Sequence, residues 1–369
     1  MARRPSTVTW TWRSILLLVL FFLLVWLLRE FAGIDLLGGN EITDTVTGEW
    51  IAVYFTSPRY PDDPALHTGG VDLHLVDLID AAQQQVDVAA YQLNLPTVTD
   101  ALLRAHRRGV RVRLVTDGEY EDEEMVARLR RAGVPITVRP KDGGIMHNKF
   151  IVVDGTWVWT GSWNLTENCT YRNNNNAVLI ASRHLAEDYA TEFEELFNGR
   201  FGPTSPKNTP YPTVVIEMPE KSLRVPVEVY FAPEDKVASH LIPVLSGARR
   251  SVRFMAFSFT SQDIADALID LARRGVSVEG VVEGRSTEAA YGQYTSLKEA
   301  GIPVWKDGNP YLLHHKVFIV DEEIVVLGSY NFTGNAEKDN DENLLIIHSP
   351  EVARAFLGEY GRIWQQAER

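Results

Sequence analysis

A stretch of eighteen residues occurs twice in this chain, and it constrains the fold and the chemistry more than any other feature. The first copy, residues 147–164, reads HNKFIVVDGTWVWTGSWN, and the second, residues 314–331, reads HHKVFIVDEEIVVLGSYN. Both follow the pattern His-x-Lys, four residues, Asp, six residues, Gly-Ser-aromatic-Asn, and matched positions are shifted by 167 residues. Two such stretches in register are not expected by chance, so the sequence predicts a duplicated functional unit.

The spacing within each copy predicts a hairpin that gathers polar side chains. Residues 150–153 and 317–320 are apolar and rich in β-branched residues, which is typical of buried strands. Alternate side chains share one face of a strand, so each His points the same way as the Lys two positions later. A second apolar run, at 157–160 or 324–327, follows a turn. If the two runs pair, the Ser and Asn that end the second run return toward the His and Lys.

The group of side chains gathered in this way suits a phosphate. An ammonium supplies positive charge, and a hydroxyl and a carboxamide supply hydrogen bonds, while the imidazole is left for chemistry. The His-x-Lys-x4-Asp pattern resembles the signature of the phospholipase D superfamily of phosphodiesterases, and the resemblance covers most of the chain from about residue 50 onward. In that family two such elements meet across a pseudo-twofold axis and form one active site. The alternative, that each His is an ordinary core or surface histidine, is disfavoured by the tandem pair.

The remainder of the chain repeats as well, which predicts two similar domains. VEVYF at 227–231 matches IAVYF at 51–55, and AGIPV at 300–304 matches AGVPI at 132–136. The first unit alternates predicted strands and helices, namely strands at 50–55, 86–91, 110–116 and 135–138 and helices at 71–82, 98–108, 121–131 and 185–197. Such alternation indicates helices packed on a buried sheet. The predicted fold is therefore α/β, with two pseudo-symmetric phospholipase D-like α-β-α sandwich domains preceded by one N-terminal transmembrane helix.

Composition shifts divide the chain into five predicted parts. They are an N-terminal signal anchor at 1–32, a tether at 33–48, a first domain at 49–200, a Pro-rich linker at 201–226 and a second domain at 227–369. The linker is predicted from its six prolines and its lack of hydrophobic periodicity.

The N-terminal segment predicts a membrane location. Three arginines precede an apolar run at 15–28, which is short for a span of about 20 residues and matches the core of a signal peptide. An Arg-Glu-Phe sequence follows the run instead of a small-x-small cleavage site, so an uncleaved anchor is preferred to a cleaved signal peptide or a buried soluble helix. Because the positive residues precede the run, the body is expected outside the cytoplasm, membrane-anchored or, after cleavage, secreted.

The resemblance implies two groups of site residues. The candidate catalytic residues are the six of the signature, His147, Lys149, Asp154, His314, Lys316 and Asp321. The candidates for binding the substrate phosphate or orienting the histidines are Ser162, Asn164, Asn175, Ser329, Asn331 and Glu342. Within the first group, the two aspartates are expected to hold structure by hydrogen bonds rather than to take part in chemistry.

Two histidines offer a route for phosphodiester cleavage without a metal. One neutral imidazole attacks phosphorus to form a covalent phosphohistidine, and the other, protonated, gives its proton to the leaving alkoxide and then activates water. The lysines and asparagines of the signature stabilise charge on the non-bridging oxygens. Two adjacent lysines would repel a bound cation, so no metal and no cofactor is predicted.

The two copies differ at one position that bears on these roles. The second copy has Glu342 in NDENLLII, whereas the first has Asn175 in NNNNAVLI. Proteins similar to this one often place a carboxylate there to orient a catalytic imidazole. The sequence leaves open whether Glu342 serves His314 or reaches His147 in the other repeat. By resemblance, His147 is assigned as the nucleophile and His314 as the acid.

Composition narrows the function. A net charge of −13 does not give the broad basic surface of a general nucleic-acid binder. The single cysteine, Cys169, excludes an intrachain disulfide and a Cys-based metal site. The prediction is a hydrolase of membrane glycerophospholipid that contacts the membrane through its N-terminal helix. The alternatives are an extracytoplasmic endonuclease acting on DNA or RNA, a phosphatidyl transferase resembling cardiolipin synthases, and an inactive binding or scaffold protein.

Overall fold

The computed structural model describes residues 42–141, 143–285 and 292–367. The predicted signal anchor at 1–32 and most of the predicted tether lie outside the described residues. Among the helices of the described ranges, none combines the length and the apolar character needed to cross a bilayer.

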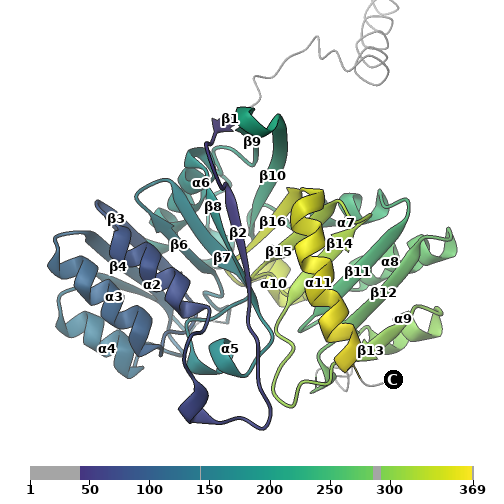
Figure 1. Cartoon of the computed structure of the whole chain (residues 1–369), viewed down its shortest axis with the longest axis horizontal. Helices are drawn as coiled ribbons and strands as arrows, with labels where there is room; N and C mark the ends of the chain where they lie inside the picture. Colours follow the sequence, from purple (N-terminus) through teal and green to yellow (C-terminus); the bar gives the residue numbers. More distant parts are fainter. Residues whose placement is uncertain (1–41, 142, 286–291, 368–369) are drawn as a thin grey trace, which may run out of the picture. The chain divides into compact units, whose positions relative to one another are not determined.

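Two mixed sheets form the framework, one for each repeat (Figure 1). The first has the strand order β2-β8-β7-β6-β3-β4-β5 and the second the order β1-β9-β10-β16-β15-β14-β11-β12-β13. The first sheet consists of β2 (Ile51–Phe55), β3 (Gln85–Ala90), β4 (Arg111–Asp117), β5 (Ile136–Arg139), β6 (Lys149–Val153), β7 (Trp157–Gly161) and β8 (Asn176–Ala181). The second consists of β1 (Thr43–Thr45), β9 (Thr213–Met218), β10 (Leu223–Ala232), β11 (Ser251–Ala256), β12 (Ser277–Val282), β13 (Val304–Lys306), β14 (Lys316–Val320), β15 (Ile324–Gly328) and β16 (Glu342–His348).

The helices pack in three groups around these sheets. One group shares a core with the first sheet and comprises α2 (Asp72–Ala81), α3 (Pro96–Arg107) and α4 (Glu124–Arg131). Another shares a core with the second sheet and comprises α7 (Ala238–Ser246), α8 (Gln262–Arg273) and α9 (Tyr294–Glu299). Between the sheets lie α6 (Arg183–Phe197) and α11 (Pro350–Gln366). The short elements are α5 (Glu167–Tyr171), α10 (Gly334–Lys338), η1 (Pro64–Leu66), η2 (Gly202–Thr204) and η3 (Pro219–Lys221).

The middle layer belongs to both repeats. Tyr189 of α6 is fully buried, and its ring packs edge-on against Phe150 of the first sheet and Phe231 of the second, with centroid distances of 4.9 and 5.2 Å. Phe356 of α11 lies in the same apolar cluster. Two repeated α/β units are therefore confirmed, and they share one central core.

Each signature folds as the predicted hairpin. β6 pairs antiparallel with β7, and β14 pairs antiparallel with β15. The first strand of each hairpin is buried along its whole length, which explains its continuous apolar run. Asp154 and Asp321 start the turns with φ angles of 51° and 53°, a left-handed conformation that Asp tolerates better than most residues.

The signature aspartates tie these turns to the neighbouring strand. Asp154 accepts hydrogen bonds from the backbone N–H groups of residues 83–85, at 2.8 to 2.9 Å, and Asp321 accepts them from residues 249–251, at 2.7 to 2.9 Å. Both carboxylates lie beyond the end of the strand that begins with the signature lysine, about 16 Å along it. The catalytic assignment of Asp154 and Asp321 is therefore replaced by a structural one, in agreement with the expectation that they hold structure.

The predicted linker and the described end of the predicted tether both contribute strands to the second sheet. Within the linker, the β-branched run 214–216 lies in β9, which pairs antiparallel with β10 and parallel with β1. β1 lies in the segment assigned to the tether, and its Asp44 accepts a hydrogen bond from the backbone N–H of His184 at 3.0 Å. The prolines at 212 and 219 flank β9 instead of marking a flexible segment. A single short strand between prolines carries too little periodicity to be recognised from sequence.

The aspartate contacts make a stability prediction. Burial alone would raise the pKa of the Asp154 carboxyl, but the three N–H donors hold that pKa below its usual value. Asp154→Ala should lower the free energy of unfolding by about 2 kcal/mol at neutral pH, because three donors lose a charged acceptor. The deficit should shrink as the pH falls through the folded-state pKa, where the wild-type carboxylate also loses its charge.

The measurement is urea unfolding at neutral pH and at about pH 3. Asp154→Asn is the matched control, because Asn tolerates the same backbone conformation and keeps one acceptor oxygen. Its loss of stability should be smaller. An alanine variant as stable as the asparagine variant would contradict this role.

Candidate active site

The two signature histidines lie where the repeats meet. Lys149 begins β6 and Lys316 begins β14, and each histidine stands two residues earlier. The backbone N–H of His147 donates to the carbonyl of Asp341 at 3.0 Å, and that of His314 donates to the carbonyl of Asn174 at 2.9 Å. Each histidine is thus fixed at its main chain by the other repeat.

The imidazoles are also oriented by the other repeat. Nδ1 of His147 lies 2.7 Å from Oε2 of Glu342, and Nδ1 of His314 lies 2.8 Å from Oδ1 of Asn175. The question that the sequence left open is thereby answered, because Glu342 reaches across the junction to His147. Both contacts use Nδ1 of the imidazole.

Two buried serines hold these orienting groups. Ser162 donates to Oδ1 of Asn175 at 3.0 Å, and Ser329 donates to Oε2 of Glu342 at 2.7 Å. Both serines have no exposed surface. The Asn175 amide is fixed further because its Nδ2 donates to the carbonyl of Cys169, so Oδ1 accepts and Nδ1 of His314 carries the proton. Ser162 and Ser329 therefore orient the histidines, and the structure does not support direct contact of their hydroxyls with phosphate.

Each lysine is held close to its own histidine and beside an aromatic ring. Nζ of Lys149 donates to the carbonyl of His147 at 2.7 Å and lies 5.2 Å from the centroid of the Tyr91 ring. Nζ of Lys316 donates to the carbonyl of His314 at 2.9 Å and lies 4.8 Å from the centroid of Phe257. Such positions favour a positive charge over the ring face.

The same two rings pack edge-on against the imidazoles. The centroid of Tyr91 lies 4.9 Å from that of His147, and the centroid of Phe257 lies 4.7 Å from that of His314. Sequence reasoning missed both rings as site residues. A signal was present, since AAYQLN at 89–94 and MAFSFT at 255–260 match with an aromatic residue at the third position of each.

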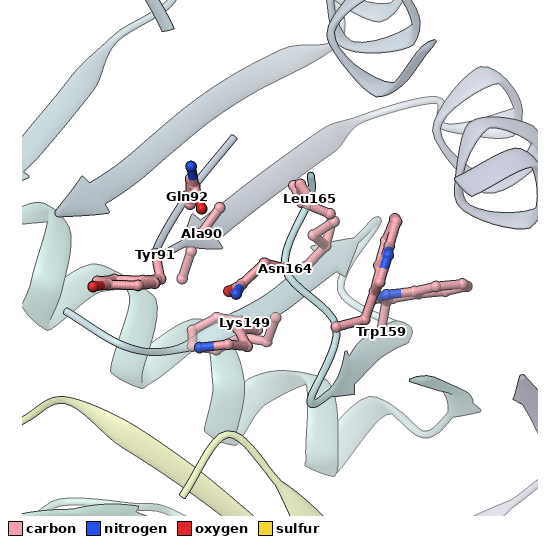
Figure 2. A pocket seen from close by; sticks show the side chains of 11 residues that line it. Ala90, Tyr91, Gln92, Lys149, Trp159, Asn164 and Leu165 are labelled. Atoms are coloured by element: carbon pink, nitrogen blue, oxygen red, sulfur yellow. The ribbon is translucent and has the colours of Figure 1, made fainter. Parts of the chain in front are cut away.

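Each signature asparagine keeps an unsatisfied polar atom, and Asn164 lines the same pocket as Lys149. Figure 2 shows the Asn164 amide, the Lys149 side chain and the Tyr91 ring around one small pocket. Oδ1 of Asn164 is buried and has no hydrogen-bond partner among the described residues, and the same holds for Oδ1 of Asn331. A half-turn of such an amide exchanges its oxygen and nitrogen, so each asparagine can present a donor to an anion.

Burial makes the site resist positive charge. Burial first, then the lysines, hold the pKa values of His147 and His314 well below their usual range. Burial lowers the pKa of Lys149 to about 7 and holds that of Lys316 well below its ordinary value. It raises the pKa of Glu342 to about 7, against the pull of Lys149. An anion bound among these groups would favour their protonated forms.

The charge of the signature lysines disfavours a metal ion among these side chains. Within the described part of the chain, the group of carboxylates able to share a metal ion is Glu192, Glu195 and Glu234. None of the three belongs to the signature, and the lysines would repel a cation between the histidines.

Comparison with known proteins identifies the family. The family described as "Cardiolipin synthase, PLD-like domain" matches residues 75–197 and 241–364, once in each repeat and over more than half of the chain. The chain belongs to this phospholipase D-like family. A phospholipase D of Rickettsia bellii is 31% identical over 150 residues, which cover 41% of this chain and 75% of that protein.

Two further proteins show how far the likeness extends. A mitochondrial cardiolipin hydrolase of Xenopus laevis is 35% identical over 132 residues, which cover 36% of this chain and 63% of that protein. The chain therefore spans less than two thirds of this relative. A phosphatidylserine synthase structure from Haemophilus influenzae aligns with a TM-score of 0.60 over 86% of this chain and 87% of that one, at 14% identity. That alignment shows a shared fold.

The crossed contacts predict how the two imidazoles behave in NMR spectra. Because burial lowers both pKa values, the rings of His147 and His314 should stay neutral, with the proton on Nδ1, between about pH 6 and 8. Glu342→Gln should move the Nδ1–H resonance of His147 and leave that of His314 in place, whereas Asn175→Ala should do the reverse. A Glu342→Gln spectrum in which only His314 moves would contradict the crossed arrangement.

Proposed function

We propose that this protein is a phosphodiesterase that hydrolyses membrane glycerophospholipid through a covalent phosphohistidine. The observation that carries the proposal is the pair of buried histidines, each oriented at Nδ1 by the other repeat. This arrangement supports two imidazoles acting through Nε2 on one phosphorus, which is what a two-step displacement requires.

The contacts of the two rings support different roles. A carboxylate that accepts the Nδ1 proton of His147 makes Nε2 more basic, whereas the Asn175 amide orients His314 without adding charge. His147 is therefore assigned as the nucleophile. Its Nε2 forms a bond to phosphorus while the bond from phosphorus to the leaving oxygen breaks, and His314 gives its Nε2 proton to that oxygen. Water then attacks phosphorus, returns a proton to His314 and releases His147.

The remaining polar groups complete an anion site. Lys149 and Lys316 supply positive charge. The amides of Asn164 and Asn331, whose Oδ1 atoms have no hydrogen-bond partner among the described residues, supply hydrogen bonds to the non-bridging oxygens. The substrate itself contributes the missing negative charge. Its binding raises the lowered pKa values of the lysines and of His314, so the acid acquires its proton in the complex.

A lipid substrate fits the surroundings of the site better than a nucleic acid. On the side of the first repeat, Tyr91 donates to Glu119 at 2.9 Å and Gln92 donates to Glu123 at 2.7 Å. These carboxylates and the net charge of −13 disfavour a polyanionic strand. The names of the relatives, cardiolipin hydrolase and phospholipase D, also support a phospholipid. Anchoring through residues 1–32 and an extracytoplasmic location are part of the same proposal.

The substrate is tested with the full chain in EDTA, on vesicles of phosphatidylcholine or cardiolipin and on single-stranded DNA and RNA. The expected product from either lipid is phosphatidic acid, because water is the acceptor. Turnover should persist in EDTA, because no metal takes part. Cleavage of nucleic acid without lipid hydrolysis would instead establish the endonuclease, and transfer of a phosphatidyl group to an alcohol the transferase. Loss of turnover in EDTA while the protein remains folded would contradict the metal-free mechanism.

The two histidines should be equally indispensable. His147→Ala and His314→Ala should each lower kcat at least about a hundredfold on phospholipid, because nucleophile and acid act as a unit. His106→Ala, on α3 and outside the site, is the control and should keep wild-type turnover. If either active-site variant retained more than about a tenth of the activity, the shared site would be wrong.

A further inference from the structure

A second cluster of charged groups lies at the repeat junction, outside the histidine site. Glu192 and Glu195 lie on α6 of the first repeat, and Glu234 follows β10 of the second. One carboxylate oxygen from each lies within 4.8 Å of the others. Glu192 and Glu195 are each 3% exposed, and Glu234 is half-buried.

None of the described lysines, arginines or histidines forms an ion pair with these carboxylates. Both oxygens of Glu195 are shielded from solvent, and neither accepts a hydrogen bond of normal geometry from the described residues. Oε2 of Glu234 is likewise buried and unpartnered. The exposed Arg200 and Asn208 lower the pKa of Glu195, but burial, the larger effect, raises it. Buried carboxylates normally have a cation, a proton or a metal to offset their charge.

The second repeat shows what the first one lacks. Glu359 of α11 corresponds to Glu192 at the same shift of 167 residues, and Arg362 corresponds to Glu195. Arg362 donates to both oxygens of Glu359, at 2.8 and 2.6 Å. The first repeat thus has a carboxylate in the position where the second has a guanidinium, although the neighbouring contacts match. Glu192 accepts from Asn148 at 3.0 Å, and Glu359 lies 3.0 Å from His315.

We propose that the carboxylates of Glu192, Glu195 and Glu234 bind a hard divalent cation of the calcium class, which takes the place of the Arg362 guanidinium. Calcium prefers oxygen ligands at about 2.3 to 2.6 Å, so ligands on opposite sides of the ion lie about 5 Å apart, which agrees with the spacing of the cluster. A surface pocket of about 270 Å³ borders Glu195.

The bound ion would act on structure and not on the chemical step. It joins α6 of the first repeat to the segment after β10 of the second, and Glu192 contacts Asn148, which stands between His147 and Lys149. The inference does not rest on the proposed function. Turnover in EDTA is expected to remain unchanged at temperatures where the chain stays folded.

Protons compete with the cation for these carboxylates. Burial raises the pKa of Glu234 to about 8 and holds that of Glu192 well above its usual value. Asp235 and Asp341 face the cluster and raise these pKa values further, while Arg139 pairs with Asp341 at 2.7 Å. Cation binding should therefore strengthen as the pH rises and the protons leave.

The test is the thermal unfolding of the full chain in EDTA and in about 1 mM Ca²⁺, at about pH 6 and pH 8. Calcium should raise the Tm by several degrees at pH 8 and by less at pH 6. Equilibrium dialysis with radioactive calcium should find about one ion per chain. Glu195→Gln should abolish the shift, whereas Glu187→Gln, an exposed residue on the same helix, should keep it.

A charge-reversal variant provides a second, independent test of the calcium site. Glu195→Arg installs the cation that the second repeat carries, so its Tm in EDTA should exceed that of the wild type and should not respond to calcium. A wild-type Tm that ignores calcium at pH 8 would overturn the proposal, because protons would then neutralise the cluster. A calcium shift that persists in Glu195→Gln would overturn it as well, since the ion would bind elsewhere.

Discussion

The structure depends on two hydrogen bonds that cross between the repeats, from His147 to Glu342 and from His314 to Asn175. Each histidine is oriented by the other repeat, as the site proposed above requires. The crossed backbone contacts and the shared layer of α6 and α11 place the two strand starts within reach of each other. We therefore propose that the two repeats form one site with two inequivalent halves.

The two halves of the site differ in the charge of matched side chains, whereas the signature hairpins and the middle helices of the two repeats match. Glu342 and Asn175 occupy matching positions, as do Glu195 and Arg362 on the middle helices. Because the positions correspond, the first pair differs by one negative charge, and the second pair carries opposite charges in the two halves. A carboxylate beside one imidazole and an amide beside the other can separate a base from an acid at a single pH. Burial lowers the pKa values of both lysines, and we propose that a bound phosphate would favour their protonated forms.

The local geometry of the site could be predicted from the sequence, because it follows from the spacing of residues within each signature. The hairpins, the shared face of each His and Lys, and the alternating helices and strands were all predictable from periodicity. The pairing of Glu342 with His147 was not predictable, because spacing within a repeat does not indicate which repeat a side chain faces. Ser162 was predicted near the histidine, but proximity alone could not show that its hydroxyl is bonded to Asn175. β9 was missed because prolines surround a short strand, and the prediction for residues 1–32 stays a prediction.

The most direct test of the account is to trap the covalent intermediate and map it. A p-nitrophenyl phosphodiester needs little help from an acid, so it should load its phosphoryl group even in a His314→Ala variant. After a rapid alkaline quench, mass spectrometry should find the phosphoryl group on His147, the histidine whose imidazole is hydrogen-bonded to Glu342. A phosphoryl group on His314 would contradict the assignment of roles by the crossed hydrogen bonds, and the absence of any adduct in the wild type would contradict covalent catalysis.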